Sequence, residues 1–165
     1  MFDVLAFVYE NYWQGDACPD TQQLERKLSA HGFDAGEIQE ALVWLDGLTL
    51  AAQHTVAAPE VAQAPSEDCS PNRQAATSLR VYSVAEQDHL GAQCLGFISF
   101  LESSGVLPAA MREIVLDRAM AAPGDPVSLD ELKIIVLMVY WSFGEQPDAL
   151  ILDELCDDSQ GRIAH

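Results

Sequence analysis

Basic residues are scarce in this sequence of 165 residues, which holds 8 lysines and arginines against 26 aspartates and glutamates. The acidic surplus is not confined to a tail: residues 1–51 hold 9 acidic and 2 basic residues, and residues 79–165 hold 14 and 5. We therefore expect a negative folded surface, which repels nucleic-acid phosphates and anionic lipids and attracts basic partners. The alternative is acidity that serves solubility alone.

The sequence also lacks a long apolar run and an export signal. Its longest apolar run, residues 134–143, is about half of a membrane span, and Lys133 and Glu145 flank it. Asp3 and Glu10 stand where a secretory signal needs positive charge. We expect a cytoplasmic protein with no membrane segment.

Cysteines are few and widely spaced, with no Cys-x-x-Cys pair: Cys18, Cys69, Cys94 and Cys156. Without an export signal, reduced thiols are expected. Cys94 falls on the apolar stripe of a predicted helix and Cys18 has no nearby base, so neither is predicted to be a nucleophile.

Apolar spacing predicts three helices in a compact N-terminal unit over 1–51: residues 2–13, about 21–31, and a third helix from Asp34. Gly32 ends the second helix, and Asp34-Ala-Gly-Glu37 has the form of a capping box. This arrangement is compatible with a helix-turn-helix or winged-helix core.

Residues 52–78 change in composition. They hold seven alanines and three prolines with few large apolar residues, so we predict a flexible linker. The following Leu79–Ser83 alternates apolar and polar residues and is strand-like. A single short strand is not stable alone, so it either pairs, as a wing for example, or lies extended across the helices.

A C-terminal helical unit is predicted over 79–165, with helices at roughly 84–103, 109–121, 129–143 and 148–156. Ser83-Val-Ala-Glu86 and Ser128-Leu-Asp-Glu131 are capping boxes that open two of them. The fold class is therefore all-α, with about seven helices in two groups. Whether the groups pack as one domain, and the oligomeric state, stay open.

The third N-terminal helix would be the recognition helix of a DNA-binding module. It carries Glu37, Glu40 and Asp46 and no lysine or arginine, so direct nucleic-acid binding is not expected. We predict that Glu37, Glu40 and Trp44 form a surface for a protein partner. For Trp44 itself, core packing is the default interpretation, and contact with a partner is the alternative.

Two groups of acidic residues resemble parts of metal-binding or catalytic sites. Glu86-x-x-His89 is half of a carboxylate di-metal motif, but no second copy exists. Glu113 and Asp117 share a helix face, yet an exposed, ion-paired face formed with the flanking Arg112 and Arg118 explains them more simply. We predict no catalytic residue, no metal site and no cofactor.

Several sequence blocks, taken in order, resemble the Smg family of bacterial proteins over nearly the whole chain. They are Met-Phe-Asp-Val-Leu at the start, Ala41-Leu-Val-Trp-Leu-Asp-Gly-Leu48, Arg80-Val-Tyr-Ser83, Gly96-Phe-Ile-Ser-Phe-Leu-Glu102, Gly105-Val-Leu, Arg112-Glu-Ile-Val-Leu-Asp-Arg118 and Leu129-Asp-Glu-Leu-Lys-Ile-Ile-Val-Leu-Met-Val139. The resemblance implies no activity, catalytic residue or cofactor. Genes of this family often lie beside genes for DNA processing and topology, which is context rather than mechanism.

These observations favour a non-enzymatic interaction or regulatory protein that presents an acidic helical surface to a protein partner, and the acidic charge favours a basic partner. The alternative is a nucleic-acid-associated factor with a helix-turn-helix-like N-terminal unit that acts indirectly. An enzyme with an unrecognised site is the third hypothesis.

Overall fold

The computed structural model describes residues 1–12, 21–56 and 80–145, and these ranges contain six α-helices and no strand. The all-α prediction is confirmed. The predicted helix at 148–156 lies outside the described residues. The helices are α1 (Phe2–Tyr12), α2 (Thr21–Ala30), α3 (Ala35–Val56), α4 (Val84–Ser103), α5 (Ala109–Met120) and α6 (Leu129–Phe143).

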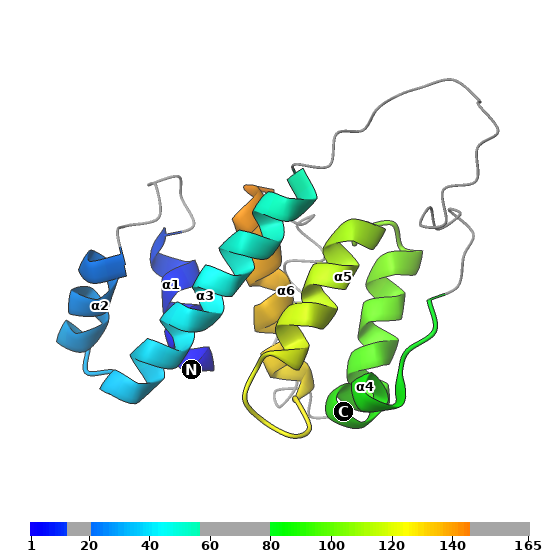
Figure 1. Cartoon of the computed structure of the whole chain (residues 1–165), viewed down its shortest axis with the longest axis horizontal. Helices are drawn as coiled ribbons and strands as arrows, with labels where there is room; N and C mark the ends of the chain where they lie inside the picture. Colours follow the sequence, from blue (N-terminus) through cyan, green and yellow to red (C-terminus); the bar gives the residue numbers. More distant parts are fainter. Residues whose placement is uncertain (13–20, 57–79, 146–165) are drawn as a thin grey trace, which may run out of the picture.

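Helix α6 is the centre of the packing and contacts α1, α3, α4 and α5. Helix α3 crosses in front of α6 (Figure 1) and also contacts α1, α2 and α5. Buried side chains from all six helices belong to one hydrophobic cluster. Helices from the two predicted groups therefore share a continuous core.

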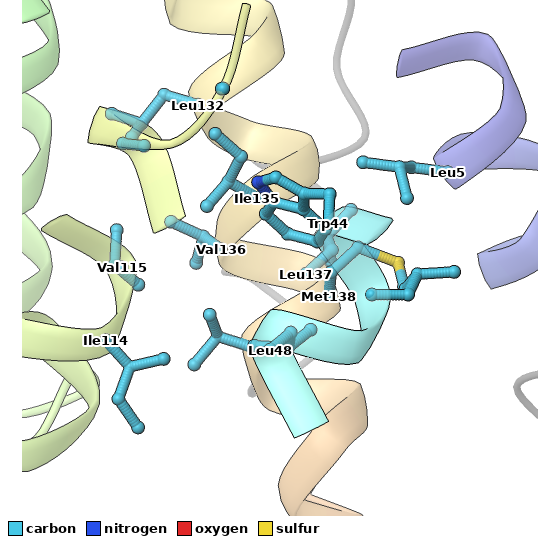
Figure 2. Packing of buried hydrophobic residues seen from close by; sticks show 14 of the residues in the cluster. Leu5, Trp44, Leu48, Ile114, Val115, Leu132, Ile135, Val136, Leu137 and Met138 are labelled. Atoms are coloured by element: carbon cyan, nitrogen blue, oxygen red, sulfur yellow. The ribbon is translucent and has the colours of Figure 1, made fainter. Parts of the chain in front are cut away.

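The centre of this core is the contact of α3 and α5 with α6. Figure 2 shows Leu48 of α3 near Val136 and Val115, which come from α6 and α5, and all three are at most 1 % exposed. Leu5 of α1 enters the same cluster from the other side of α3 and is fully buried. Burial of each such aliphatic side chain contributes about 1.5–3 kcal/mol.

Helix α6 begins and ends where the sequence predicts. The Ser128 side chain accepts the N–H of Glu131, the Glu131 carboxylate accepts the N–H of Ser128, and Gly144 ends the helix at φ 66°. Lys133, which flanks the apolar run, is only 4 % exposed, and its Nζ lies 6.0 Å from the centroid of the Phe97 ring. No helix within the described ranges is long and apolar enough to cross a membrane.

Helix α3 is longer than predicted and continues past residue 51 to Val56. The linker predicted from residue 52 therefore starts too early. Ala52 is buried and Ala51 packs against the core, and these tertiary contacts stabilise the last part of the helix. At the other end, Asp34 Oδ1 accepts the N–H of Gly36 at 3.0 Å. Residues 57–79 lie outside the described part.

The strand-like segment is not a strand over its described residues, Arg80–Ser83. Among the described residues no strand pairs with it as a wing. Instead Arg80 forms ion pairs with α4 and α5, and Ser83 is the N-cap of α4 with ψ 161°. The alternating apolar and polar residues belong to an extended segment that leads into the N-terminus of α4. Over so few residues, the sequence pattern of such a segment is the same as that of a strand.

Helix α4 has the predicted bounds but is interrupted at Gly91, where φ is 66° and ψ is 172°. Both backbone groups of Val127, which precedes α6, bind α4 beside this break. The N–H of Val127 donates to the His89 carbonyl at 2.8 Å, and the Cys94 thiol donates to the Val127 carbonyl at 3.4 Å. The break thus positions the α5–α6 connection.

Candidate functional site

The outward face of α3 carries exposed aliphatic side chains. Its inward face is formed by Ile38, Ala41, Trp44, Leu45 and Leu48, which are all buried. On the opposite side, Val43 and Leu50 are 63 % and 52 % exposed. Residues seven apart lie on nearly one line of a helix, about 10.5 Å along its axis. The outward face therefore carries two aligned aliphatic side chains.

Acidic side chains border this line on both sides. Glu40 and Asp46 are each three residues from Val43 and so lie about 60° to either side of it around the helix. Both are exposed, and α3 contains no lysine or arginine. Glu37 lies one turn before Glu40, and its Oε1 is 3.7 Å from the Met1 amino group. We call Glu40, Val43, Asp46 and Leu50 the α3 stripe.

The structure places Trp44 in the core, which is the default interpretation of its place in the sequence. Its side chain is 4 % exposed and its Nε1 donates to the Arg118 carbonyl at 2.9 Å. Of the predicted partner surface, Glu37 and Glu40 remain accessible. The sequence prediction did not include Val43 and Leu50. Helical spacing nevertheless places both of them opposite the buried residues of α3.

One guanidinium lies beside the α3 stripe. Arg118 of α5 covers Gly47, where an added Cβ would overlap its Nη1 atom. Arg118 Nη2 lies 2.6 Å from Asp117 Oδ2, so its charge is paired within α5. The glycine allows α5 to pack closely on α3, and the ion pair limits the positive field next to the stripe.

A second charged cluster joins the segment before α4 to α5. Arg80 Nη2 lies 2.7 Å from Glu86 Oε1, and Arg80 Nε lies 3.2 Å from Glu113 Oε1. The hydrogen bonds from Arg80, reinforced by the Ser83 N–H, lower the pKa of Glu86 to about 2. These carboxylates raise the pKa of Arg80 further above its ordinary value. The cluster stays ionised at neutral pH.

Arg112 extends this cluster into the core. The sequence suggested an exposed ion-paired face, and that is wrong for Arg112, which is 2 % exposed. Arg112 contacts Glu102 of α4 and lies 2.8 Å from Glu113 Oε1. Burial raises the pKa of Glu113, but the hydrogen bonds from Arg80 and Arg112 outweigh it and lower that pKa overall. Asp117 is paired with Arg118, whereas Glu113 is paired with Arg80 and Arg112, so the two carboxylates share no partner.

Glu86 and His89 do not converge. Glu86 binds Arg80, whereas His89 Nε2 lies 3.1 Å from the Ala119 carbonyl and Nδ1 lies 3.8 Å from Asp125 Oδ1. Among the described residues, no three His, Cys, Asp or Glu side chains are grouped as a metal ion requires. His89 is half-buried because the end of α5 and the following loop pack against it.

Where they are described, the cysteines and the two neighbouring aromatic residues of α6, Tyr140 and Trp141, contribute to packing. Cys94 is buried, and burial, followed by the charge of Glu131, raises the pKa of its thiol. Tyr140 is buried and its hydroxyl donates to the Val106 carbonyl. The Trp141 Nε1 lies 3.5 Å from the Tyr12 carbonyl. Outside the described residues lie Trp13, Cys18, Cys69 and Cys156.

The fold and this surface define an all-helical protein with one continuous core and an outward helix face that combines aliphatic and acidic side chains. The whole chain, residues 1–165, matches the family described as "Protein of unknown function (DUF494)". The chain belongs to this family, the Smg family of bacterial proteins, as its sequence blocks suggested.

Curated relatives share the full length of the chain. A protein named Smg homolog from Leptothrix cholodnii is 58 % identical over 165 residues, and one from Methylibium petroleiphilum is 57 % identical over 166 residues; both alignments cover all of each chain. A Smg homolog from Bordetella avium is 48 % identical, again over the full length of both. No solved structure matches the chain.

Proposed function

We propose that this protein is a non-enzymatic interaction or regulatory protein that works in the cytoplasm and presents the outward side of α3 to a basic protein partner. The observation that carries the proposal is the composition of the α3 stripe. Val43 and Leu50 are exposed between Glu40 and Asp46 on a helix without lysine or arginine. Exposed aliphatic side chains with a polar border are typical of protein contacts, and the net charge of −18 favours a basic partner.

The same face makes direct DNA reading a poor alternative. In a helix-turn-helix protein the recognition helix enters the groove close to the phosphates, and positive charge there supplies much of the affinity. Glu40 and Asp46 would instead oppose the phosphates. An indirect association with nucleic acid through a protein partner is compatible with the proposal. Treatment with nuclease distinguishes a partner held by protein contact from one held through nucleic acid.

The proposal is tested by affinity purification of the full chain from its native cells at low salt, with and without nuclease. We expect a basic protein to be retained in both conditions. The variant Glu37→Lys/Glu40→Lys should lose it, because the charge of the docking face is reversed. Circular dichroism must first show that this variant is folded, since Glu37 also pairs with the Met1 amino group.

The matched control is Glu25→Lys/Asp88→Lys, which makes the same change in net charge at exposed positions of α2 and α4. It should retain the partner. Equal loss in both double variants would show that total charge alone governs binding and would contradict an α3 docking face. Loss of all retained protein on nuclease treatment would favour the nucleic-acid alternative.

A further inference from the structure

The α3 stripe also limits the shape of what it binds. Resting on the proposed function, we infer that the partner docks on α3 through a basic amphipathic helix, with apolar side chains on Val43 and Leu50 and lysines or arginines beside Glu40 and Asp46.

Spacing favours a helix as the docking element. The Val43 and Leu50 side chains lie about two turns apart, and an amphipathic helix repeats its apolar side chains at the same interval. Two helices can then pack side by side with both pairs in contact. An extended peptide normally binds by adding to a sheet edge, and the described residues contain no strand.

The acidic residues of the α3 stripe favour a positively charged partner and argue against a second copy of this chain. Glu40 and Asp46 border the apolar line on both sides, so lysines or arginines on both flanks of the partner's apolar face would meet a carboxylate. Two α3 stripes face to face would bring like charges together without a compensating cation on either helix. The neighbouring Arg118 is already paired with Asp117 and leaves the acidic border intact.

The test uses the full chain and a fluorescently labelled 18-residue peptide of leucine and lysine with its leucines on one helical face, followed by fluorescence anisotropy. A second peptide has the same composition in an order that removes the apolar face. We expect the amphipathic peptide to bind at least about tenfold more tightly than the reordered one, since only it can contact the aliphatic pair and the acidic border together.

Apolar contact is tested with Val43→Ser/Leu50→Ser, which should weaken binding of the amphipathic peptide about tenfold. Its matched control is Val81→Ser/Val84→Ser, which alters two side chains that are 79 % and 74 % exposed near the start of α4 and should change binding less than about twofold. Equal effects of the two double variants, or no effect of the first, would overturn the inference.

A third comparison separates this inference from the proposed function. Glu40→Lys/Asp46→Lys should weaken binding of the amphipathic peptide far more than Glu25→Lys/Asp88→Lys. If this charge difference holds while the serine variants bind normally, the acidic face of α3 stands as a docking site but the amphipathic-helix partner is wrong. If the two charge variants behave alike, the α3 face itself is wrong and the proposed function fails with it.

Discussion

The indole Nε1 of Trp44 donates a 2.9 Å hydrogen bond to the backbone carbonyl of Arg118. Trp44 belongs to α3, and Arg118 lies in the last turn of α5, where a carbonyl has no partner within its own helix. The bond therefore satisfies a helix terminus and links the two predicted groups of helices. Trp44 faces inward, whereas Val43, its neighbour in sequence, lies about 100° away around the helix and faces solvent.

Replacement of Trp44 with phenylalanine should lower the free energy of unfolding by about 2–3 kcal/mol. The substitution removes the indole donor, leaves the Arg118 carbonyl unsatisfied and reduces the volume that fills the core. Urea unfolding followed by far-UV circular dichroism measures the change. Trp141→Phe is the control, because Trp141 is half-buried and its hydrogen bond is longer at 3.5 Å. An equal loss in both variants would mean that the contact with Arg118 has no special weight.

Replacement of Arg80 with methionine should reduce stability by about 1–2 kcal/mol at pH 7, after allowance for solvent screening at this partly open cluster. The pKa of Glu86 is lowered from its ordinary 4.5 to about 2 in the folded protein. The unfolded chain therefore binds more protons between these values, and the stabilisation by Arg80 is present above pH 4.5 and lost as pH falls towards 2.

Denaturant unfolding at several pH values from 7 to about 2.5 tests this dependence. The stabilities of the wild-type chain and Arg80→Met should converge as the pH falls. Arg26→Met, at an exposed position of α2, should show a small difference from wild type that does not vary in this way. A constant gap between wild type and Arg80→Met at all pH values would contradict the assignment of the shift to Arg80.

Alanine at Gly47 should fail to stabilise α3. In a helix interior, alanine is favoured over glycine by about 1 kcal/mol. At Gly47, however, the new Cβ would overlap Arg118 Nη1 and displace the guanidinium. At Gly96 of α4 an added Cβ meets nothing within 4 Å, so Gly96→Ala should give about 0.5–1 kcal/mol of stabilisation.

A double-variant cycle identifies the cause at Gly47. In an Arg118→Ala background, Gly47→Ala should recover most of the missing helix propensity, because the overlapping group is gone. Thermal and urea unfolding of the two single variants and the double variant measure this coupling. A stabilising Gly47→Ala in the wild-type background would show that Arg118 moves aside at no cost.

Local signals in the sequence predicted the helix starts at Ser83 and Ser128, because a capping box places both of its partners within one turn. The bounds of α6 follow from the same signal and from Gly144 at its end. Periodicity predicts helix α3, but the prediction placed Trp44 on the partner surface, where the structure instead has Val43 and Leu50. The outward position of Val43 and Leu50 could therefore have been predicted from the sequence.

Features that depend on contacts distant in sequence could not be predicted. Arg112 is buried because Glu102 of α4 and the adjacent Glu113 surround its guanidinium, and a charged residue in an isolated pattern is expected outside. The extension of α3 to Val56 similarly depends on packing that is not visible from its alanine-rich end. The break at Gly91 is the third such feature.

Alanine at Gly91 should destabilise the protein by about 1–3 kcal/mol, in contrast to the gain expected at Gly96 in the same helix. With φ 66° and ψ 172°, Gly91 occupies a backbone region that is essentially restricted to glycine. Relief of the strain by a continuous helix would move the His89 carbonyl away from the Val127 N–H, which it binds at 2.8 Å. Hydrogen exchange should therefore accelerate at the Val127 amide in Gly91→Ala and stay unchanged in Gly96→Ala. An unchanged stability together with a protected Val127 amide would show that α4 does not need the break to hold the α5–α6 connection.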